Sequence, residues 1–473
     1  MGDAKDVETS SVITVTNPAT EEIITSYEAH TEADIHDVVH KLKMGQKAWR
    51  ETDLKDRSHF ITNFREILER QSEVCAEVQT AETGKPIDQS KGEINATRNR
   101  IDYFLKESPS ILEPMVLRKT THGSEKISRD PLGTIANISA WNYPYFIGTN
   151  VIIPALLTGN QVVYKPSEWC LNTGIKIVEM FWEAGIPKDV LDIVIGGSAQ
   201  GSALINTPID GLFFTGSHGT GQKILYSSRE KMIPIQLELG GKDAVYVTEN
   251  CDLTDAITQI LHGIFYNNGQ GCCSVERLYL HDNIYQDFVD GLLHELNQLK
   301  IGDPKQTGTY FGPLTRKAQG DVLIEQINDA LKKGAQLLAG GKKIDGTGYF
   351  FEPTVLAKAN HQMSVMKEES FGPIVGIQQV RDDQEAIALM NDSHYGLTAA
   401  VFCSDETRGK HLLKHLDTGT AYLNCCDRVS PHLPWSGRRG SGMGATLGKD
   451  GISCFTRPKS WHMRRVISQS LRK

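Results

Sequence analysis

The sequence predicts an α/β protein in which parallel sheets are covered by helices. Short apolar runs alternate with helical patterns through the middle of the chain. The apolar runs are residues 133–139, 160–167, 191–197 and 211–217, and a helical pattern at 172–185 separates the second from the third. This rhythm is typical of parallel strands, which need a crossover connection between them. The length of 473 residues exceeds what one core normally supports, so we expect two or three domains.

The first hundred residues favour amphipathic helices, and an extended hairpin follows them. Two groups of apolar residues recur at helical spacing: Ile35, Val38, Val39 and Leu42, and then Phe60, Phe64, Ile67 and Leu68. Residues 116–133 alternate in polarity and turn at Gly123, which predicts the hairpin.

A second α/β region begins near Ala244. Its helix ends just before Asn267 and has an apolar face formed by Leu253, Ala256, Ile257, Ile260, Leu261 and Ile264. Beyond about Pro434 the chain is rich in glycine and basic residues, and residues 451–461 favour a strand.

The composition argues against several classes of protein. A formal charge of -8 and a pI near 6.0 disfavour a nucleic-acid-binding surface. No apolar stretch approaches the roughly 20 residues that span a bilayer, so no membrane partner is expected. The nine cysteines show neither a disulfide framework nor paired zinc-ligand spacing, so we expect no metal site. The N-terminus resembles no signal peptide, and Asp6 weakens a myristoylation motif, so we expect a cytoplasmic protein.

Cys272 is a candidate nucleophile. It follows the long amphipathic helix in the segment 265–277, where Gly269 and Gly271 let a substrate and backbone N–H groups approach the sulfur. A thiolate is a good nucleophile towards a carbonyl carbon. The alternative is that Cys272 and Cys273 are small buried residues of the core.

Glu238 and Asn142 are candidates for the groups that assist a nucleophile. Glu238 ends an apolar run beside Gly240 and Gly241, where a carboxylate can act as a general base. Its alternative is a structural carboxylate that caps a helix or pairs with Lys242. Asn142 follows a predicted strand, and its amide N–H can stabilise an oxyanion. A single Asn in a turn is otherwise more often structural.

A cofactor site is indicated at the ends of two predicted strands. Lys165 and Glu168 end the strand at 160–165, where open α/β sheets bind ligands. Gly216, Gly219 and Gly221 follow another strand and open a predicted helix. Their spacing differs from the dinucleotide fingerprint GxGxxG, so alone they are a weak phosphate-binding signal.

Taken together, these segments resemble the aldehyde dehydrogenase superfamily from about Asn17 to Trp461. The matching motifs stand in the family's order: AWNYP at 140–144, KPSE at 165–168, FTGS at 214–217, ELGGK at 238–242, NNGQGC at 267–272 and ESFGP at 369–373. The segment 434–444, PWSGRRGSGMG, is similar to the family's PFGGxKxSGxG. Six motifs in order are too many for chance.

The resemblance implies a mechanism for the candidate residues. Cys272 attacks the aldehyde, while its backbone N–H and the Asn142 side chain hold the oxyanion. Hydride leaves to a nicotinamide cofactor, and the resulting thioester is hydrolysed by water that Glu238 activates.

The resemblance also implies the cofactor and its contacts. Glu369 holds the nicotinamide ribose near Phe371 and Trp141. The adenosine ribose and the pyrophosphate are held by Lys165, Glu168, Gly216 and Ser217. Because a carboxylate at Glu168 accepts hydrogen bonds from a free 2′-hydroxyl and repels a 2′-phosphate, we expect NAD, with NADP less favoured.

The aldehyde itself is left open by the sequence. The resemblance implies that Tyr143, Ile147, Asn150, Gly271, Cys273 and residues near Cys426 line its tunnel. Tyr143 is similar to its counterpart in aminoaldehyde and betaine aldehyde members, where aromatic faces hold a cation. Arg428 and His432 favour instead a semialdehyde with a carboxylate tail, unless they are solvated loop residues. An aliphatic or aromatic aldehyde is also open.

The chain departs from the family's usual pattern at three places. Ala140 and Trp435-Ser436 replace common residues away from the chemistry. Asn150-Val151 stands where many members carry Trp-Lys, and that Lys relays a proton from the base. The exit route of the proton from Glu238 is therefore not evident.

Two other functions remain as alternatives. A relative that transfers the acyl group to coenzyme A would resolve the thioester with a thiol, but such members usually lack a residue like Glu238. A non-catalytic protein that kept the fold would not need Cys272, Glu238 and Asn142 together.

The expected architecture has three units. A doubly wound, Rossmann-like NAD-binding domain takes residues 1–113 and 134–240, and an α/β catalytic domain takes 241–435. Residues 114–133 and 436–473 form a small β oligomerisation element, because an extended hairpin cannot bury its own apolar face. The resemblance implies a homodimer or homotetramer that acts on a small-molecule aldehyde.

Overall fold

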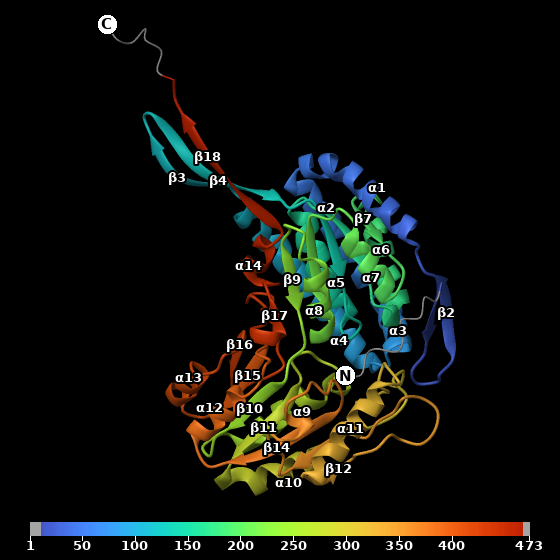
Figure 1. Ribbon diagram of the computed structural model, residues 1–473, viewed down its shortest axis with the longest axis vertical. Coiled ribbons are helices and arrows are strands. Elements are labelled where there is room, and N and C mark those ends of the chain that lie inside the picture. The colour runs from blue at the N-terminus through green and yellow to red at the C-terminus, as the bar shows by residue number, and fades with distance from the viewer. Residues whose placement is uncertain (1–10, 467–473) are drawn as a thin grey trace.

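The computed structural model describes residues 11–466 and places two open sheets at the centres of its two halves (Figure 1). The N-terminal segment considered for a signal peptide and for myristoylation, and the outermost residues of the predicted domain ranges, lie outside the described residues. A β-hairpin, β1 (Val12–Thr16) with β2 (Ile23–Glu28), begins the described part.

The first sheet is built from βα units and confirms the doubly wound fold. Its strands lie in the order β17-β9-β8-β5-β6-β7, and all pair in parallel except β17. Their bounds are β5 Thr134–Ile138, β6 Gln161–Lys165, β7 Leu191–Ile193, β8 Gly211–Thr215, β9 Ile235–Glu238 and β17 Gly442–Met443. The strand order reverses between β5 and β8, and ligands bind at such a switch point in open α/β sheets.

Helices cover both faces of this sheet because successive side chains of each strand point to opposite faces. Val162 packs in the cluster that contains Phe64 and Phe181, whereas Val163 packs in the cluster that contains Ile35 and Leu204. The helices are α1 Glu32–Glu51, α2 Leu54–Arg70, α3 Ser72–Thr83, α4 Ile87–Leu112, α5 Pro144–Leu157, α6 Leu171–Glu183, α7 Ser198–Asn206 and α8 His218–Ser227. Both predicted N-terminal amphipathic helices are thereby confirmed.

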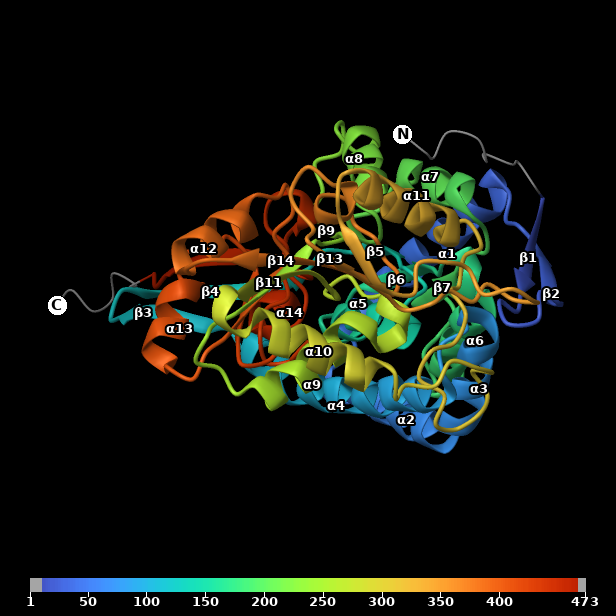
Figure 2. The same ribbon diagram turned by 90° about the horizontal axis from the view of Figure 1, so that it is seen from below.

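The second sheet has seven strands in the order β12-β13-β14-β11-β10-β15-β16, with only β12 antiparallel. Their bounds are β10 Asp243–Val247, β11 Val275–His281, β12 Gln336–Ala339, β13 Thr354–Ala357, β14 Ile374–Val380, β15 Thr398–Phe402 and β16 Thr420–Leu423. Helices α9 (Leu253–Phe265) and α10 (Tyr285–Leu296) cover one face (Figure 2). The other face is covered by α11 Gln319–Lys332, α12 Asp383–Asn391 and α13 Glu406–Leu413.

The two sheets are joined directly through residues 239–242. Strand β9 ends at Glu238 and β10 begins at Asp243, so the carboxyl end of one sheet faces the amino end of the other. The predicted positions of Glu238 and Cys272 both fall at this junction.

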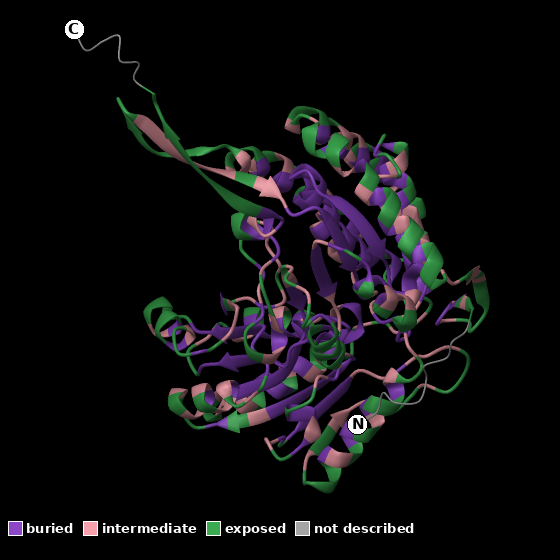
Figure 3. Ribbon diagram, turned by 45° about the horizontal axis from the view of Figure 1, so that its top comes forward, coloured by how far each residue is buried: buried purple, intermediate pink, exposed green. Residues whose placement is uncertain are grey.

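A third sheet stands away from both halves and is the most exposed part of the fold (Figure 3). It contains β3 (Met115–Thr120), β4 (Gly123–Pro131) and β18 (Thr456–Arg464), and β4 pairs with both neighbours. Its hairpin agrees with the predicted one. Exposed apolar side chains lie along it: Met115, Val116, Leu117, Trp461 and Met463.

The C-terminal part of the chain differs from the expected strand element. Within 436–455, β17 instead pairs with β9 of the first sheet, and α14 (Gly448–Ser453) packs on α4. Since β9 would otherwise leave unpaired backbone groups at a sheet edge, this segment closes that edge. The predicted strand at 451–461 is therefore helical in its first residues and extended only from Thr456.

Candidate active site

The loop that carries Cys272 leaves α9 through an unusual backbone. Asn267, Asn268 and Gly269 have φ angles of +53°, +56° and +66° in succession. This left-handed region favours Asn and Gly, and a Cβ at Gly269 would lie 2.2 Å from the Gly372 oxygen. The chain thus reverses sharply before Cys272, which is partly exposed, whereas Cys273 is buried.

Side-chain hydrogen bonds fix this loop. Asn268 Nδ2 donates to the carbonyl oxygens of Gly312 and Pro313 at 2.7 and 2.8 Å, and Thr315 N donates to Gln270 Oε1 at 3.0 Å. Gly271 N donates to Ser274 Oγ at 3.1 Å. Because these bonds come from separate segments, the position of Cys272 depends on tertiary structure.

Asn142 joins the first sheet to this loop. It follows β5, is buried, and donates from Nδ2 to the Gln270 oxygen at 2.9 Å, two residues before Cys272. Asn267 Nδ2 returns a hydrogen bond to the Asn142 oxygen at 3.2 Å. The Asn142 side chain therefore does not merely stabilise a turn. It connects the first sheet to the loop that carries Cys272.

Glu238 lies at the end of β9 with only 7% of its surface exposed. Its Oε1 accepts from Gln236 Nε2 at 3.3 Å and from Thr446 Oγ1 at 3.4 Å, whereas its buried Oε2 has no hydrogen-bond partner. Burial raises the pKa of this carboxyl group to about 8, against the weaker effect of the two hydrogen bonds. An unsatisfied buried carboxylate oxygen is available for a water molecule.

A buried ion pair argues against the pairing with Lys242 that was the alternative for Glu238. Lys242 pairs with Glu276 of β11, not with Glu238, and it also donates to Ser370 Oγ at 3.0 Å. Glu276 accepts from the backbone N–H groups of Ser370 and Phe371 at 2.8 and 2.9 Å. One pair therefore connects the segments that carry Glu238, Cys272 and Glu369.

Glu369 and two aromatic rings lie at the same junction. Glu369 Oε1 accepts from Gly241 N at 3.1 Å, and a Cβ at Gly240 would lie 2.1 Å from that oxygen. Burial and the neighbouring Glu276 raise the pKa of Glu369 to about 8. The rings of Trp141 and Phe371 meet edge to face with centroids 5.5 Å apart. The structure thus brings together three of the predicted cofactor residues.

The other predicted cofactor residues lie at the carboxyl ends of β6 and β8. Lys165 is buried at the end of β6, and its Nζ lies 3.9 Å from Glu168 Oε2. Gly216 follows β8, and Ser217 caps the first turn of α8 by accepting from Thr220 N at 3.4 Å. These strands lie on the two sides of β5, so the set surrounds the switch point, where helix N-termini favour anions.

This geometry agrees with a comparison with known proteins. The aldehyde dehydrogenase family model matches residues 5–461.

The chain belongs to the aldehyde dehydrogenase family.

Its relatives and their structures share both length and fold. The chain is 33% identical to the chloroplastic betaine aldehyde dehydrogenase of Atriplex hortensis, covering 94% of this chain and 91% of that protein. It is 32% identical to the peroxisomal aminoaldehyde dehydrogenase 1 of Pisum sativum, covering 93% and 90%. The structure of PnpE in complex with nicotinamide adenine dinucleotide has a TM-score of 0.93 and 32% identity, covering 98% and 96%. This protein is accordingly an enzyme that oxidises an aldehyde to a carboxylic acid.

The predicted substrate residues of this aldehyde dehydrogenase lie at the start of α5, on its first turns, and in the loop of Cys272. The Tyr143 ring stacks on Phe146 at a centroid distance of 5.8 Å, and Cys273 Sγ donates to Asp427 Oδ1 at 3.1 Å. Asn150 Oδ1 accepts from Arg100 Nη1 at 3.3 Å. Ile147 is half-buried on α5, one turn after Tyr143, and Gly271 precedes Cys272 in the loop.

Arg428 and His432 are not part of this group. Both are exposed: Arg428 donates to Gln259 Oε1 at 3.0 Å, and the His432 ring meets the edge of Tyr103. The structure supports the interpretation of these two as surface loop residues.

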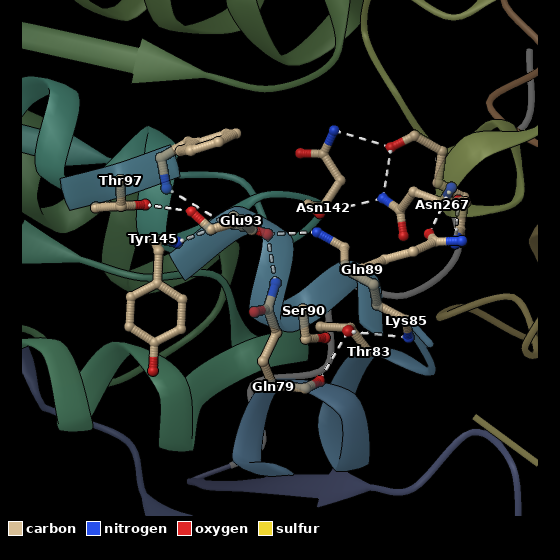
Figure 4. Close-up of polar contacts among 12 residues, drawn as sticks. Gln79, Thr83, Lys85, Gln89, Ser90, Glu93, Thr97, Asn142, Tyr145 and Asn267 are labelled. Atoms are coloured by element: carbon tan, nitrogen blue, oxygen red, sulfur yellow. Dashed lines mark hydrogen bonds and ion pairs between the residues drawn. The ribbon is translucent and has the colours of Figure 1, made fainter. Parts of the chain in front are cut away.

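A network centred on α4 holds the start of α5 and the Cys272 loop, and no sequence pattern indicated it (Figure 4). Buried Glu93 pairs with Lys85 and caps the start of α5 by accepting from Tyr145 N at 2.9 Å and Phe146 N at 3.2 Å. Gln89 Oε1 accepts from Asn267 N at 2.9 Å, so α4 also holds the Cys272 loop. Lys85 Nζ lies 3.8 Å from the centroid of the Tyr143 ring.

Arg100 and Asp427 are further residues that the sequence did not indicate. Arg100 shares the buried face of α4 with Glu93, Thr97 and Phe104, at helical spacing. That periodicity could have identified it as a charge on a core face, although not its proximity to Cys272. Asp427 has no comparable signal, because it lies in an irregular loop with a φ of +49°.

Two negative findings apply to residues 11–466. No helix there is both long and apolar enough to cross a membrane. Within the same residues, His, Cys, Asp and Glu side chains form no group of three or more that could hold a metal ion.

The ion pair of Lys242 with Glu276 should be a large contributor to the stability of this aldehyde dehydrogenase. Lys242→Met leaves the Glu276 charge buried and uncompensated, so we expect the free energy of unfolding to fall by about 3–5 kcal/mol. The measurement is urea unfolding followed by circular dichroism. Lys410→Met, which breaks an exposed pair with Glu406, is the matched control and should change stability by less than about 0.5 kcal/mol.

The double variant Lys242→Met with Glu276→Gln should regain part of the free energy of unfolding that Lys242→Met loses. It removes the unpaired charge but keeps an oxygen for the N–H groups of Ser370 and Phe371. Equal stability of the single and double variants would contradict the uncompensated charge as the cause.

Proposed function

We propose that this enzyme oxidises its aldehyde with NAD through a thiohemiacetal and a thioester on Cys272, and that Glu238 activates the water that hydrolyses the thioester. The observation that supports the proposal is the contact of three segments at the junction of the two sheets. Asn142 is hydrogen-bonded to Gln270 of the Cys272 loop, and Glu238 ends β9 three residues before Gly241, where a Cβ would lie 2.8 Å from the Cys272 oxygen.

Asn142 is the proposed oxyanion donor. An Asn amide has two N–H groups, and the hydrogen bond to Gln270 uses only one. The second can point at the oxygen of the attacked carbonyl, together with the backbone N–H of Cys272. The side-chain amide is held by the Gln270 carbonyl and the Asn142 backbone carbonyl by Asn267 Nδ2, so the donor needs little reorganisation as charge develops.

The residues around the first sheet fit a dinucleotide. The ten-residue helix α8 begins directly after Gly216 and Ser217. Lys165 and Glu168 lie at the end of β6, on the other side of β5 from this helix. Glu369, Phe371 and Trp141 would hold the nicotinamide end. When bound, NAD accepts the hydride that leaves the thiohemiacetal. The related PnpE structure in complex with nicotinamide adenine dinucleotide supports this cofactor.

Glu238 is the proposed base of the hydrolytic step. Its buried, unpartnered Oε2 can accept a proton from water, and its raised pKa makes the carboxylate a stronger base than an exposed Glu. This carboxylate favours hydrolysis over transfer of the acyl group to coenzyme A. Val151 stands at the position of the family's relay Lys and is buried. Its side chain has no group that can accept and pass on a proton, so the Glu238 proton must leave by another path.

We also propose a cytoplasmic homodimer or homotetramer. The exposed apolar side chains of the β3-β4-β18 sheet support an oligomer, because a three-stranded sheet that leaves such side chains uncovered is marginal alone. The nine free cysteines support a reducing compartment. Sedimentation at micromolar concentration should give a species of two or four chains, and a monomer would contradict the assignment.

Cys272→Ala should abolish oxidation and leave NAD binding intact, because only the covalent step is lost. NADH formation with an aldehyde panel measures the first effect, and calorimetric titration with NAD the second. Cys273→Ser, one residue away, is the control and should retain activity within about tenfold. Substantial turnover by Cys272→Ala would exclude Cys272 as the nucleophile.

Glu238→Gln should slow hydrolysis of the thioester more than hydride transfer. In stopped-flow experiments we expect a burst of NADH that nearly matches the enzyme concentration, followed by a slow steady state. Equal loss in both phases would assign Glu238 another role.

The pH dependence of the wild type follows from the same carboxyl group. With a pKa of about 8, Glu238 is mostly protonated at pH 7 and becomes a base as pH rises. The steady-state kcat should therefore increase through pH 8, and Glu238→Gln should lose this dependence.

NAD should be preferred to NADP. Glu168 would accept hydrogen bonds from the free 2′-hydroxyl and repel a 2′-phosphate, whereas Lys165 offsets part of that repulsion. The preference should be on the order of 1–3 kcal/mol in kcat/KM with one good aldehyde. Glu168→Gln should reduce the preference for NAD over NADP. A wild type that favours NADP would refute the assignment of Glu168 as the residue that discriminates between the two cofactors.

A further inference from the structure

Arg100 is a buried cation beside the reacting thiol. It lies on the inner face of α4 with 5% of its surface exposed. Burial lowers its pKa to about 10, and Glu93, Cys273 and Cys272 are near enough to oppose that effect. The guanidinium therefore keeps its charge at neutral pH and is close to both thiols of the loop.

No carboxylate of the described residues 11–466 forms an ion pair with this charge. Within the same residues its two hydrogen bonds go to neutral oxygens, Asn150 Oδ1 and the Val429 carbonyl, both at 3.3 Å. The Glu93 carboxylate already pairs with Lys85 and accepts hydrogen bonds from Gln79 and from two backbone N–H groups. Buried charges are normally paired, so a guanidinium with five N–H donors and two long, neutral contacts is incompletely satisfied.

The surroundings of Arg100 are the expected walls of the aldehyde tunnel. Its guanidinium carbon lies 3.6 Å from the centroid of the Phe146 ring, which stacks on Tyr143. Asn150 is a predicted substrate residue, and Val429 belongs to the loop that follows Cys426. The Arg100 guanidinium is thus fixed by stacking on Phe146, and its N–H groups can donate to a ligand that lies in the guanidinium plane.

The other charged groups of this region do not cancel Arg100. Asp427 is bound by the Cys273 thiol, and burial raises the pKa of this carboxyl group to about 7, so its charge at neutral pH is partial. Lys85 is compensated by Glu93. Arg428 is exposed and directed to Gln259. The uncompensated charge of the tunnel is positive.

We infer that Arg100 binds a carboxylate at the far end of the substrate, and that this enzyme acts on semialdehydes, aldehydes with an anionic tail. The inference rests on the proposed function, in which Cys272 attacks the aldehyde end. A carboxylate matches the two parallel N–H donors of a guanidinium and would supply the missing counter-charge. A trimethylammonium or amino tail would instead meet an unpaired positive charge. The oxidation itself is unchanged: the aldehyde carbon loses hydride to NAD and gains oxygen from water.

The test is a comparison of substrates that differ only in the charge of the tail. We would measure kcat/KM with NAD for succinic semialdehyde and its longer homologues, for 4-oxobutanamide as the uncharged isostere, and for 3-aminopropanal as the cation. The wild type should prefer the best semialdehyde over its amide by about 100-fold, the ordinary effect of one buried charged contact. It should oxidise 3-aminopropanal least well.

Arg100→Met should remove most of that ratio, mainly through KM for the semialdehyde, and Arg100→Lys should keep part of it. Arg428→Met is the matched control, since it removes an exposed Arg from the neighbouring loop and should leave the ratio within about threefold. If Arg100→Met fails to fold, the wild-type ratio of kcat/KM for the semialdehyde to kcat/KM for the amide still tests whether the site prefers an anionic tail.

The outcomes separate the two levels of the proposal. A wild type that oxidises the neutral and cationic aldehydes as well as the semialdehydes would overturn the role of Arg100 and leave the proposed function intact. An unchanged ratio in Arg100→Met would do the same, because it would confine Arg100 to a structural or thiol-activating role. Failure to reduce NAD with any aldehyde would overturn the proposed function itself.

Discussion

The buried pair of Lys242 and Glu276 is the constraint on which the geometry of this site depends. Glu276 lies four residues after Cys272, Lys242 lies four residues after Glu238, and both bind the segment of Glu369 and Phe371. Two charges without access to water must stay together, since separating them is far more costly than their net attraction suggests. The pair therefore holds the proposed nucleophile, the proposed base and a proposed cofactor-binding residue in register, although none of these three belongs to it.

A second buried pair plays a similar part on the substrate side. Lys85 and Glu93 hold the start of α5, and the loop before α5 carries Trp141, Asn142 and Tyr143. Gln89, one turn earlier on α4, reaches the Cys272 loop through Asn267. The long helix α4 is thus a scaffold for the segments of both the proposed oxyanion donor and the proposed nucleophile, because a rigid element sets side chains more accurately than a loop.

Burial gives the site its chemical character. It raises the pKa values of Glu238, Glu369 and Asp427 together, so that the carboxylates of the junction are stronger bases than exposed ones. Burial has another consequence for the guanidinium of Arg100, which keeps its charge and has no ion-pair partner among residues 11–466. Low local polarity thus makes Glu238 suitable for activating water and makes an anionic ligand favourable at Arg100.

The sequence by itself determined the fold class, the two N-terminal amphipathic helices, the hairpin and the motifs of the family. These follow from local periodicity and from glycine and polar residues at strand ends, which are encoded within a few neighbouring positions. It also determined which residue types are available for chemistry at Cys272, Glu238 and Asn142. Only the tertiary structure decided that Lys242 pairs with Glu276, that residues 436–455 close the edge of β9, and that Arg100 faces the thiols. Such contacts join positions far apart in the chain, and which pairs meet depends on how the two sheets pack, which no local pattern records.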